Sequence, residues 1–119
     1  MSGGARIGTG VAVGFSSPVT GRAQYVAGVE SVLALMSEDV SGMILIVREA
    51  GATGVAPIIG DAGGVVCLTG GPTSHLALVA KEYGVPALMG AELSGDPAAL
   101  DGTAITLNPD GSITAGSGD

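Results

Sequence analysis

The chain has 119 residues and a formal net charge of −7, with four Lys and Arg against eleven Asp and Glu. This length fits one domain, and the acidic balance argues against nucleic acid or an anionic membrane surface as a partner. With 22 glycines, two Tyr, one Phe and no Trp, the core is expected to consist of small aliphatic side chains, which favours an α/β or β-rich body over a helix bundle.

The cysteine content and the first residues indicate the compartment. Cys67 is the only cysteine, which excludes an internal disulfide and fits a reducing environment. The first residues lack the basic and apolar regions of a signal peptide, and no apolar run approaches the ~18 residues of a membrane span. We therefore expect a cytoplasmic protein.

The chain is expected to form a single domain over residues 10–115, with a flexible leader at 1–9 and a flexible tail at 116–119. Val11–Phe15 and Arg22–Val29 alternate well enough for two strands. The turn residues between them predict a β-hairpin.

The middle of the chain contains two further predicted strands. Glu30–Ser37 has the spacing of a short helix, and the continuous apolar run Gly42–Val47 predicts a strand covered on both faces. A second apolar strand over Asp61–Thr69 leads to Gly70 and Gly71, where glycine lets the backbone approach a ligand closely.

A helix is predicted over residues 75–83. Thr73 and Ser74 offer N-cap hydroxyls before an apolar run, and Gly84 followed by Pro86 supplies the stop signals. Four residues at i, i+3, i+4 and i+7 form a stripe that we expect to be buried, namely Leu76, Val79, Ala80 and Tyr83.

The last part of the chain is expected to be mainly β. Pro86–Met89 reads as a short strand that Gly90 ends with a turn, and Asp96–Leu100 as a single helical turn. Ala104–Leu107 and Ser112–Ala115 flank Asp-Gly, which predicts a hairpin.

His75, the only histidine, falls in the first turn of the predicted helix. The backbone N–H groups there lack intrahelical partners, and the macrodipole disfavours a charged imidazole, so a nucleophilic nitrogen stays available near pH 7. A phosphoryl group on that nitrogen would meet the hydroxyls of Thr73 and Ser74 and the free N–H donors. The sequence therefore predicts an anion site with a nucleophile in it.

The stretch Gly70–Gly90, G-G-P-T-S-H-L-A-L-V-A-K-E-Y-G-V-P-A-L-M-G, resembles the phosphohistidine motif of the mobile, swivelling domain of PEP-utilising enzymes. This family includes pyruvate phosphate dikinase, phosphoenolpyruvate synthase and enzyme I of the sugar phosphotransferase system. Its pattern is approximately G-G-x-T-S-H-x-A-I-V-A-R-E-x-G-I-P-A-V-V-G. Gly14–Ala23 is similar, more loosely, to the opening segment of the family, and Lys81 replaces the usual arginine.

The resemblance implies a swivelling β/β/α fold, which is an α/β fold with a mixed-sheet sandwich and short helices. It also implies that His75 carries a phosphoryl group between the active sites of partner domains or subunits of the ATP-grasp and PEP/pyruvate-barrel types. Mg²⁺ with ATP or PEP is then expected at the partner site, and no metal or cofactor on this chain. The chain would be a component of a phosphotransferase rather than a complete enzyme.

By the same resemblance, Thr73 lies next to the phosphoryl group. The predicted phosphate-binding residues are Thr73, Ser74, Gly70, Gly71 and Lys81. The family often has an acidic residue where Leu68 or Thr69 stands here.

Other interpretations of these residues are weaker. One His and one Cys do not make a zinc site, Ser74 has no second histidine to act as its base, and the G-K-[ST] of a nucleotide loop is absent. Thr73 could also be a plain N-cap, and Lys81 part of a solvated helix face. Arg22 and Arg48 are expected to be surface residues. The functional alternative is a non-catalytic binding or regulatory module that retains the family fold.

Overall fold

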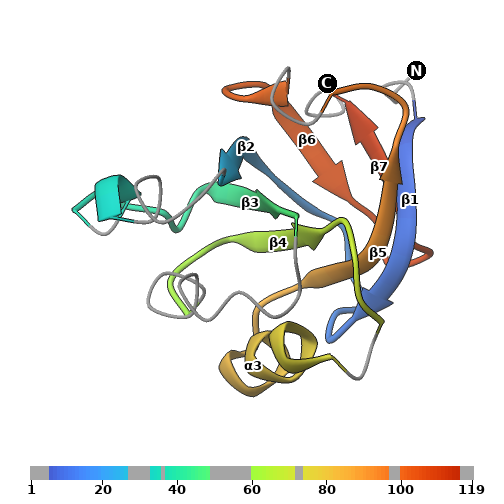
Figure 1. Cartoon of the computed structure of the whole chain (residues 1–119), viewed down its shortest axis with the longest axis horizontal. Helices are drawn as coiled ribbons and strands as arrows, with labels where there is room; N and C mark the ends of the chain where they lie inside the picture. Colours follow the sequence, from blue (N-terminus) through green and yellow to red (C-terminus); the bar gives the residue numbers. More distant parts are fainter. Residues whose placement is uncertain are drawn as a thin grey trace.

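The computed structural model describes residues 6–26, 33–35, 37–48, 60–71, 74–96 and 100–115. Predictions for the leader before residue 6, half of the helix at 30–37, Thr73, most of the turn at 96–100 and the tail lie outside these residues. Seven strands and one helix are defined (Figure 1): β1 Arg6–Val13, β2 Val19–Val26, β3 Met43–Val47, β4 Gly64–Cys67, α3 His75–Tyr83, β5 Ala87–Leu93, β6 Ala104–Leu107 and β7 Ser112–Ala115.

The seven strands close into one barrel in the order β1-β5-β4-β3-β2-β6-β7, with β7 paired back to β1. The strands β2, β3, β4 and β5 are parallel neighbours, whereas the other pairs are antiparallel. Val26 pairs with Val47, and Val47 pairs with Cys67, so β2, β3 and β4 end at the same edge of the barrel. We call this edge the carboxyl rim.

The predicted fold class, an α/β swivelling β/β/α domain with a mixed-sheet sandwich, is wrong. The structure is mostly a closed β-barrel with a single nine-residue helix, α3, in the described part of the chain apart from the helical residues 33–35. The physical reason is that β1 pairs along both of its edges, with β5 on one side and β7 on the other. This double pairing joins the two ends of the sheet and leaves one layer of strands wrapped around a core.

The predicted hairpin between the first two strands is also wrong. β1 begins at Arg6, inside the expected leader, and runs antiparallel to β5 and β7, while β2 pairs with β3 and β6. The turn residues after Gly14 connect two strands that belong to different parts of the barrel. The hairpin of β6 and β7 is confirmed, with the N–H of Gly111 donating to the carbonyl of Asn108 at 2.9 Å.

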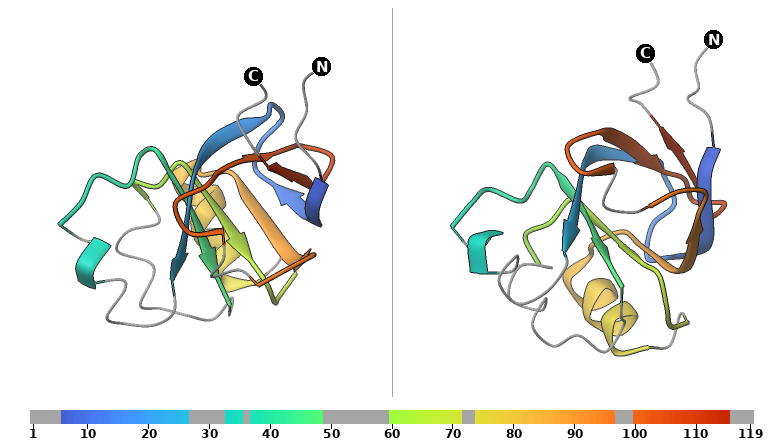
Figure 2. Two further views of the ribbon diagram at one scale, coloured as in Figure 1. Left: turned by 90° about the horizontal axis from the view of Figure 1, so that it is seen from above. Right: turned by 45° about the horizontal axis from the view of Figure 1, so that its top comes forward.

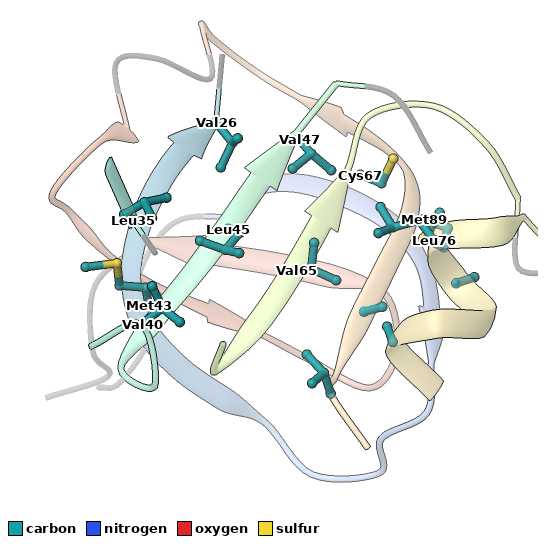
Figure 3. Close-up of a cluster of buried hydrophobic side chains, with 14 residues drawn as sticks. Val26, Leu35, Val40, Met43, Leu45, Val47, Val65, Cys67, Leu76 and Met89 are labelled. Carbon is teal, nitrogen blue, oxygen red and sulfur yellow. The ribbon is translucent and has the colours of Figure 1, made fainter. Parts of the chain in front are cut away.

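The strand predicted over Gly42–Val47 is confirmed by β3, in which all five residues are buried. Its alternate residues enter two separate cores, because successive side chains of a strand point to opposite faces. Ile44 and Ile46 belong to the cluster inside the barrel, and Leu45 and Val47 to a second cluster outside it. The second cluster includes Leu76 of α3, and Figure 3 shows it running across β3 and β4, with Leu76 and Met89 at the end beside the helix.

The helix α3 packs on the outside of the barrel, against the wall that contains β5 (Figure 2). Leu76 and Ala80 are buried as predicted, and Val79 packs against the same cluster. Tyr83, expected in the buried stripe, is 60% exposed, and Ala77 is buried instead. Within the described residues, no helix has the length and apolar character needed to cross a membrane.

Closure of the barrel depends on a close backbone approach between Gly10 of β1 and Gly111 in the β6–β7 turn. The N–H of Gly10 donates to the carbonyl of Gly111 at 2.7 Å, and Gly111 has a φ of 98°. A Cβ at position 111 would lie 2.2 Å from the carbonyl oxygen of Gly10. Because that oxygen belongs to the backbone, no side-chain movement relieves the overlap.

Gly111→Ala is therefore expected to lower the free energy of unfolding by about 3 kcal/mol, from the left-handed backbone and the overlap together. Gly102→Ala is the matched control, because Gly102 has a φ of 82° but no atom within 4 Å of an added Cβ. This control is expected to cost about 1–2 kcal/mol. Urea unfolding measures both values, and equal losses would contradict the proposed role of close approach.

Asp110 contributes an acid-sensitive contact to the same turn. Its Oδ1 accepts hydrogen bonds from the hydroxyl of Ser112 at 2.7 Å and from the N–H of Ser112 at 2.9 Å. The side-chain bond, followed by the backbone bond, lowers the pKa of Asp110 below its ordinary value. Since the folded pKa is lowered, the stability that this carboxylate contributes is present above the unfolded pKa and is lost as the pH falls through the folded pKa.

We expect the free energy of unfolding to fall between about pH 5 and pH 2, a range that brackets the ordinary Asp pKa of about 3.9. Asp110→Asn keeps an oxygen acceptor but cannot ionise, so this loss is expected to be smaller in the variant. Ser112→Ala removes the hydroxyl donor and should also reduce the loss. Urea unfolding at several pH values tests this, and an unchanged pH slope in both variants would count against it.

Candidate functional site

The connection from β4 to α3 begins at the carboxyl rim and is fastened there to β3. The N–H of Leu68 donates to the carbonyl of Val47 at 2.9 Å, and the hydroxyl of Thr69 donates to the carbonyl of Arg48 at 2.8 Å. The first bond continues the backbone pairing of β3 and β4 beyond the last paired residues, and the second adds a side-chain bond one residue further along each strand. The start of the connection is therefore fixed to the barrel wall.

Gly70 and Gly71 follow, as predicted, at the point where the chain leaves the strand. Gly70 has a φ of 83°, a conformation that favours glycine. A Cβ at Gly90 of β5 would lie 3.1 Å from the carbonyl oxygen of Gly70, so the connection passes close to β5. A Cβ at Gly71 would meet no atom within 4 Å, so the space beside Gly71 is open.

The helix begins and ends at the predicted residues. Ser74 is the N-cap residue, with extended φ and ψ of −68° and 164°, and its carbonyl accepts the N–H of Leu78 at 3.0 Å. Gly84 is the C-cap residue in the left-handed conformation, with a φ of 73°. In contrast to the prediction, the Ser74 side chain makes no capping hydrogen bond.

The hydroxyl of Ser74 is a buried polar group without a partner. Its Oγ has no hydrogen-bond partner among the described residues, whereas the N–H of Ser74 donates to the carbonyl of Gly71 at 3.0 Å. A buried hydroxyl without a hydrogen bond costs free energy, and such a group calls for an explanation such as strain, a catalytic role or a bound water or ion. The hydroxyl and the first N–H groups of α3 together form a set of donors at the start of the helix.

His75 is the first residue of α3, and its side chain is exposed to solvent. It therefore lies at the positive end of the helix macrodipole, which is equivalent to about half an elementary charge. The imidazole is accessible to a second molecule, while the helix start beside it offers N–H groups to an anion. The geometry suits a nucleophile that receives an anionic group from outside the domain.

The structure does not bring all the predicted phosphate-binding residues together. Ser74 directly precedes His75, Gly70 and Gly71 lie a few positions earlier in the connection, and Thr73 lies outside the described residues. Lys81 is six residues further along α3, about 9 Å along the axis at 1.5 Å per residue. Its exposed side chain lies in the last turn of the helix, away from the end that carries His75.

The sequence predicts only that Arg48 is a surface residue. The structure places it on the carboxyl rim. Arg48 directly follows β3, and its Nε donates to the hydroxyl of Tyr25 at 2.9 Å. Its guanidinium carbon lies 5.9 Å from the centre of the Tyr25 ring. The only signal in the sequence is a basic residue at the end of a buried parallel strand, the side of such sheets where ligands usually bind.

Within the described residues, no three His, Cys, Asp or Glu side chains form a group that could hold a metal ion. A hollow of about 270 Å³ is lined by residues of β1 and β5 between Arg6 and Thr9 and between Glu92 and Ser94. It contains neither His75 nor the residues that precede it. Of the described residues of the candidate site, His75 is exposed to solvent and lies outside this hollow.

The fold and the site together define a small β-barrel domain that presents a histidine at the start of its packed helix. Residues 39–111 match the family described as "PEP-utilising enzyme, mobile domain", and the chain belongs to this family. The match includes β3, β4, α3, β5 and β6, and therefore the whole candidate site.

Among solved structures, the chain is similar to the solution NMR structure of a UPF0107 protein, with a TM-score of 0.55 and 14% identity. The similarity covers 92% of this chain and 98% of the other, and at this identity it shows a shared fold alone. No curated protein matches the sequence.

Ser74→Ala tests whether the unpartnered hydroxyl contributes to stability. Losing an N-cap hydrogen bond typically costs about 0.5–2 kcal/mol. Because Ser74 makes no such bond, the variant is expected to keep its stability within about 0.5 kcal/mol or to gain a little. Urea unfolding of the wild type and the variant measures this, and a loss above about 1 kcal/mol would show that the hydroxyl caps the helix in solution.

Proposed function

We propose that this domain is a phosphohistidine carrier that accepts a phosphoryl group on His75 and passes it to an acceptor. The single observation that carries the proposal is the exposed histidine at the first position of α3, directly after a serine whose hydroxyl has no partner. Membership of the mobile-domain family supports the same role.

The chemistry requires little beyond an accessible nitrogen and donors for the charge of the transferred group. The lone pair of an imidazole nitrogen forms the N–P bond while the P–O bond of the donor breaks, and the donor oxygen leaves with that electron pair. The transferred group carries about −1.5 to −2 charges. On this proposal, the N–H groups at the start of α3 and the hydroxyl of Ser74 would donate to its oxygens.

The free energy with which a helix start stabilises an anion suits a carrier, which must also release its phosphoryl group. A helix N-terminus stabilises an anion by about 0.3–1 kcal/mol when exposed and by up to about 2 kcal/mol when partly buried. A much stronger interaction would hinder release of the group to the acceptor. His75 is exposed, so the lower part of this range applies.

Donor and acceptor would belong to partner domains or subunits of the ATP-grasp and PEP/pyruvate-barrel types, with Mg²⁺ and ATP or PEP at the partner site. On this proposal the domain is a component of a phosphotransferase that works in the cytoplasm. Thr73 would complete the phosphate-binding residues with Gly70, Gly71 and Ser74. Lys81 lies in the last turn of α3, away from His75, so on this proposal it would contact a phosphate of the partner and not the phosphoryl group on His75.

The test is intact mass of the wild type and of His75→Ala after incubation with Mg-ATP or PEP and a lysate of the source cells. Work-up at alkaline pH preserves phosphohistidine, which is acid-labile. The wild type is expected to gain about 80 Da, the mass of one phosphoryl group, and to lose it in acid, while His75→Ala gains nothing. The variant should fold normally, because the side chain is exposed.

An unmodified, folded wild type under both donors would contradict the carrier proposal. It would favour a binding or regulatory module that retains the family fold. An equal gain in His75→Ala would place the phosphoryl group on another residue.

A further inference from the structure

The side of α3 that faces away from the barrel carries a row of three exposed side chains. The buried residues of the helix, which face the barrel, are Leu76, Ala77 and Ala80. Successive residues of a helix are turned by about 100° around its axis. The side opposite to the buried residues is therefore occupied by His75, Leu78 and Glu82, and all three are exposed. We call these three residues the outer row.

Leu78 is the apolar member of the outer row and lies beside the histidine. Its side chain is 55% exposed. Side chains three positions apart on a helix are neighbours, with Cβ atoms about 5–6 Å apart. A protein that brings a phosphoryl group to the exposed imidazole of His75 therefore also covers Leu78. Covering this side chain removes apolar surface from water, which favours association.

The four basic residues of the chain lie outside the outer row. Arg6 begins β1, at the far end of the barrel from α3 in Figure 1. Arg22 of β2 lies opposite the first residue of β3, away from the carboxyl rim. The Arg48 side chain is held over the ring of Tyr25. Lys81 lies in the last turn of α3, about 120° around the helix from His75. The positive charge for a phosphoryl group on His75 must therefore come from a partner.

The charges of the outer row favour a basic partner surface. The chain has a net charge of −7, and Glu82 places one of its carboxylates at one end of the row. A phosphoryl group on His75 adds about −1.5 to −2 charges at the other end. Leu78 lies between the two. A surface that complements this row has cations on both sides of an apolar recess.

We infer that the outer row, with Leu78 at its centre, is the docking surface for the protein that supplies the phosphoryl group, and that this partner presents an apolar recess flanked by basic groups. This inference rests on the proposed function and adds to it the surface by which the donor protein is recognised. In this arrangement His75 reacts, whereas Leu78 and Glu82 contribute to docking alone.

The experiment compares a small phosphoryl donor with the donor protein. Phosphoramidate needs no partner protein: the N–P bond to His75 forms while the P–N bond of phosphoramidate breaks, and the leaving nitrogen departs as ammonia after taking up a proton. A lysate of the source cells with Mg-ATP or PEP supplies the donor protein. Intact mass at alkaline pH follows both rates, at domain concentrations where the rate is proportional to concentration.

Leu78→Gln removes the apolar side chain and keeps a residue that favours a helix. In the lysate, this variant is expected to be phosphorylated about tenfold more slowly than the wild type, because the apolar contact with the partner is lost. With phosphoramidate it is expected to react at the rate of the wild type, since the imidazole and the helix start are unchanged.

Leu33→Gln is the matched control. Leu33 is 61% exposed and belongs to the helical residues 33–35, which Figures 1 and 2 both place apart from α3. This variant is expected to react at the rate of the wild type with both donors. Urea unfolding is expected to give the midpoint of the wild type for both variants, because both side chains are exposed.

The salt dependence tests the charge of the partner surface. Glu82→Gln removes the carboxylate of the outer row, and Glu38→Gln is the control, because Glu38 is exposed outside α3. In the lysate, Glu82→Gln is expected to react about two- to threefold more slowly than Glu38→Gln at low salt, and as fast at about 0.5 M salt, where exposed charges are screened. Equal rates at both salt concentrations would show that the partner surface is not basic.

The outcomes separate this inference from the proposal on which it rests. If the lysate phosphorylates the wild type but Leu78→Gln reacts as fast as Leu33→Gln, the docking role is overturned and the carrier proposal stands. An equal slowing of Leu78→Gln with phosphoramidate would place the effect on the imidazole or the helix and would also overturn docking. If phosphoramidate modifies no variant, the comparison in the lysate decides alone. If the lysate leaves the wild type unmodified, both are overturned.

Discussion

The parallel register of β3 and β4 is the constraint on which the site depends. Val47 pairs with Cys67, so both strands end at one rim, and the chain must then return along the outside of the barrel to begin β5 at Ala87. α3 makes this return, and its first residue therefore lies on the side of the rim. His75 occupies that first residue. The position of the histidine thus follows from strand pairing and not from the motif alone.

Two cores hold this arrangement because β3 is buried on both faces. Ile44 and Ile46 fill the barrel, while Leu45 and Val47 face the cluster that Leu76 of α3 joins. A helix of nine residues is too short to be stable in isolation, so its packing on the barrel maintains it. Loss of that packing would remove the helix start, and with it the donors beside His75.

The elements that local signals define were predictable from the sequence. The helix from His75 to Tyr83 has a serine before it and a glycine after it, and both cap positions were found. The β6–β7 hairpin has Asp-Gly in its turn. Closure of the barrel was not predictable, because β1 finds its partners in β5 and β7, far along the chain. Nothing in the residues of β1 specifies those partners, and the turn after it favoured a hairpin.

The same division applies to the candidate site. Gly70, Gly71, Ser74 and His75 are neighbours in the sequence, so one motif identified them together. Arg48 lies more than twenty positions earlier and is brought to the rim only by the pairing of β3 with β4. The free hydroxyl of Ser74 was not foreseen either, since a serine before a helix normally caps it.

Closure has a further consequence for how the domain meets other proteins. Each described strand has a neighbour on both sides, so none offers a free row of backbone N–H and carbonyl groups. Another protein cannot extend this sheet by strand addition, a common mode of recognition at open sheet edges. Association must instead use side chains and loops, where contacts form and separate without breaking a β-ladder. For a domain proposed to visit two sites in turn, such reversible contact surfaces are an advantage.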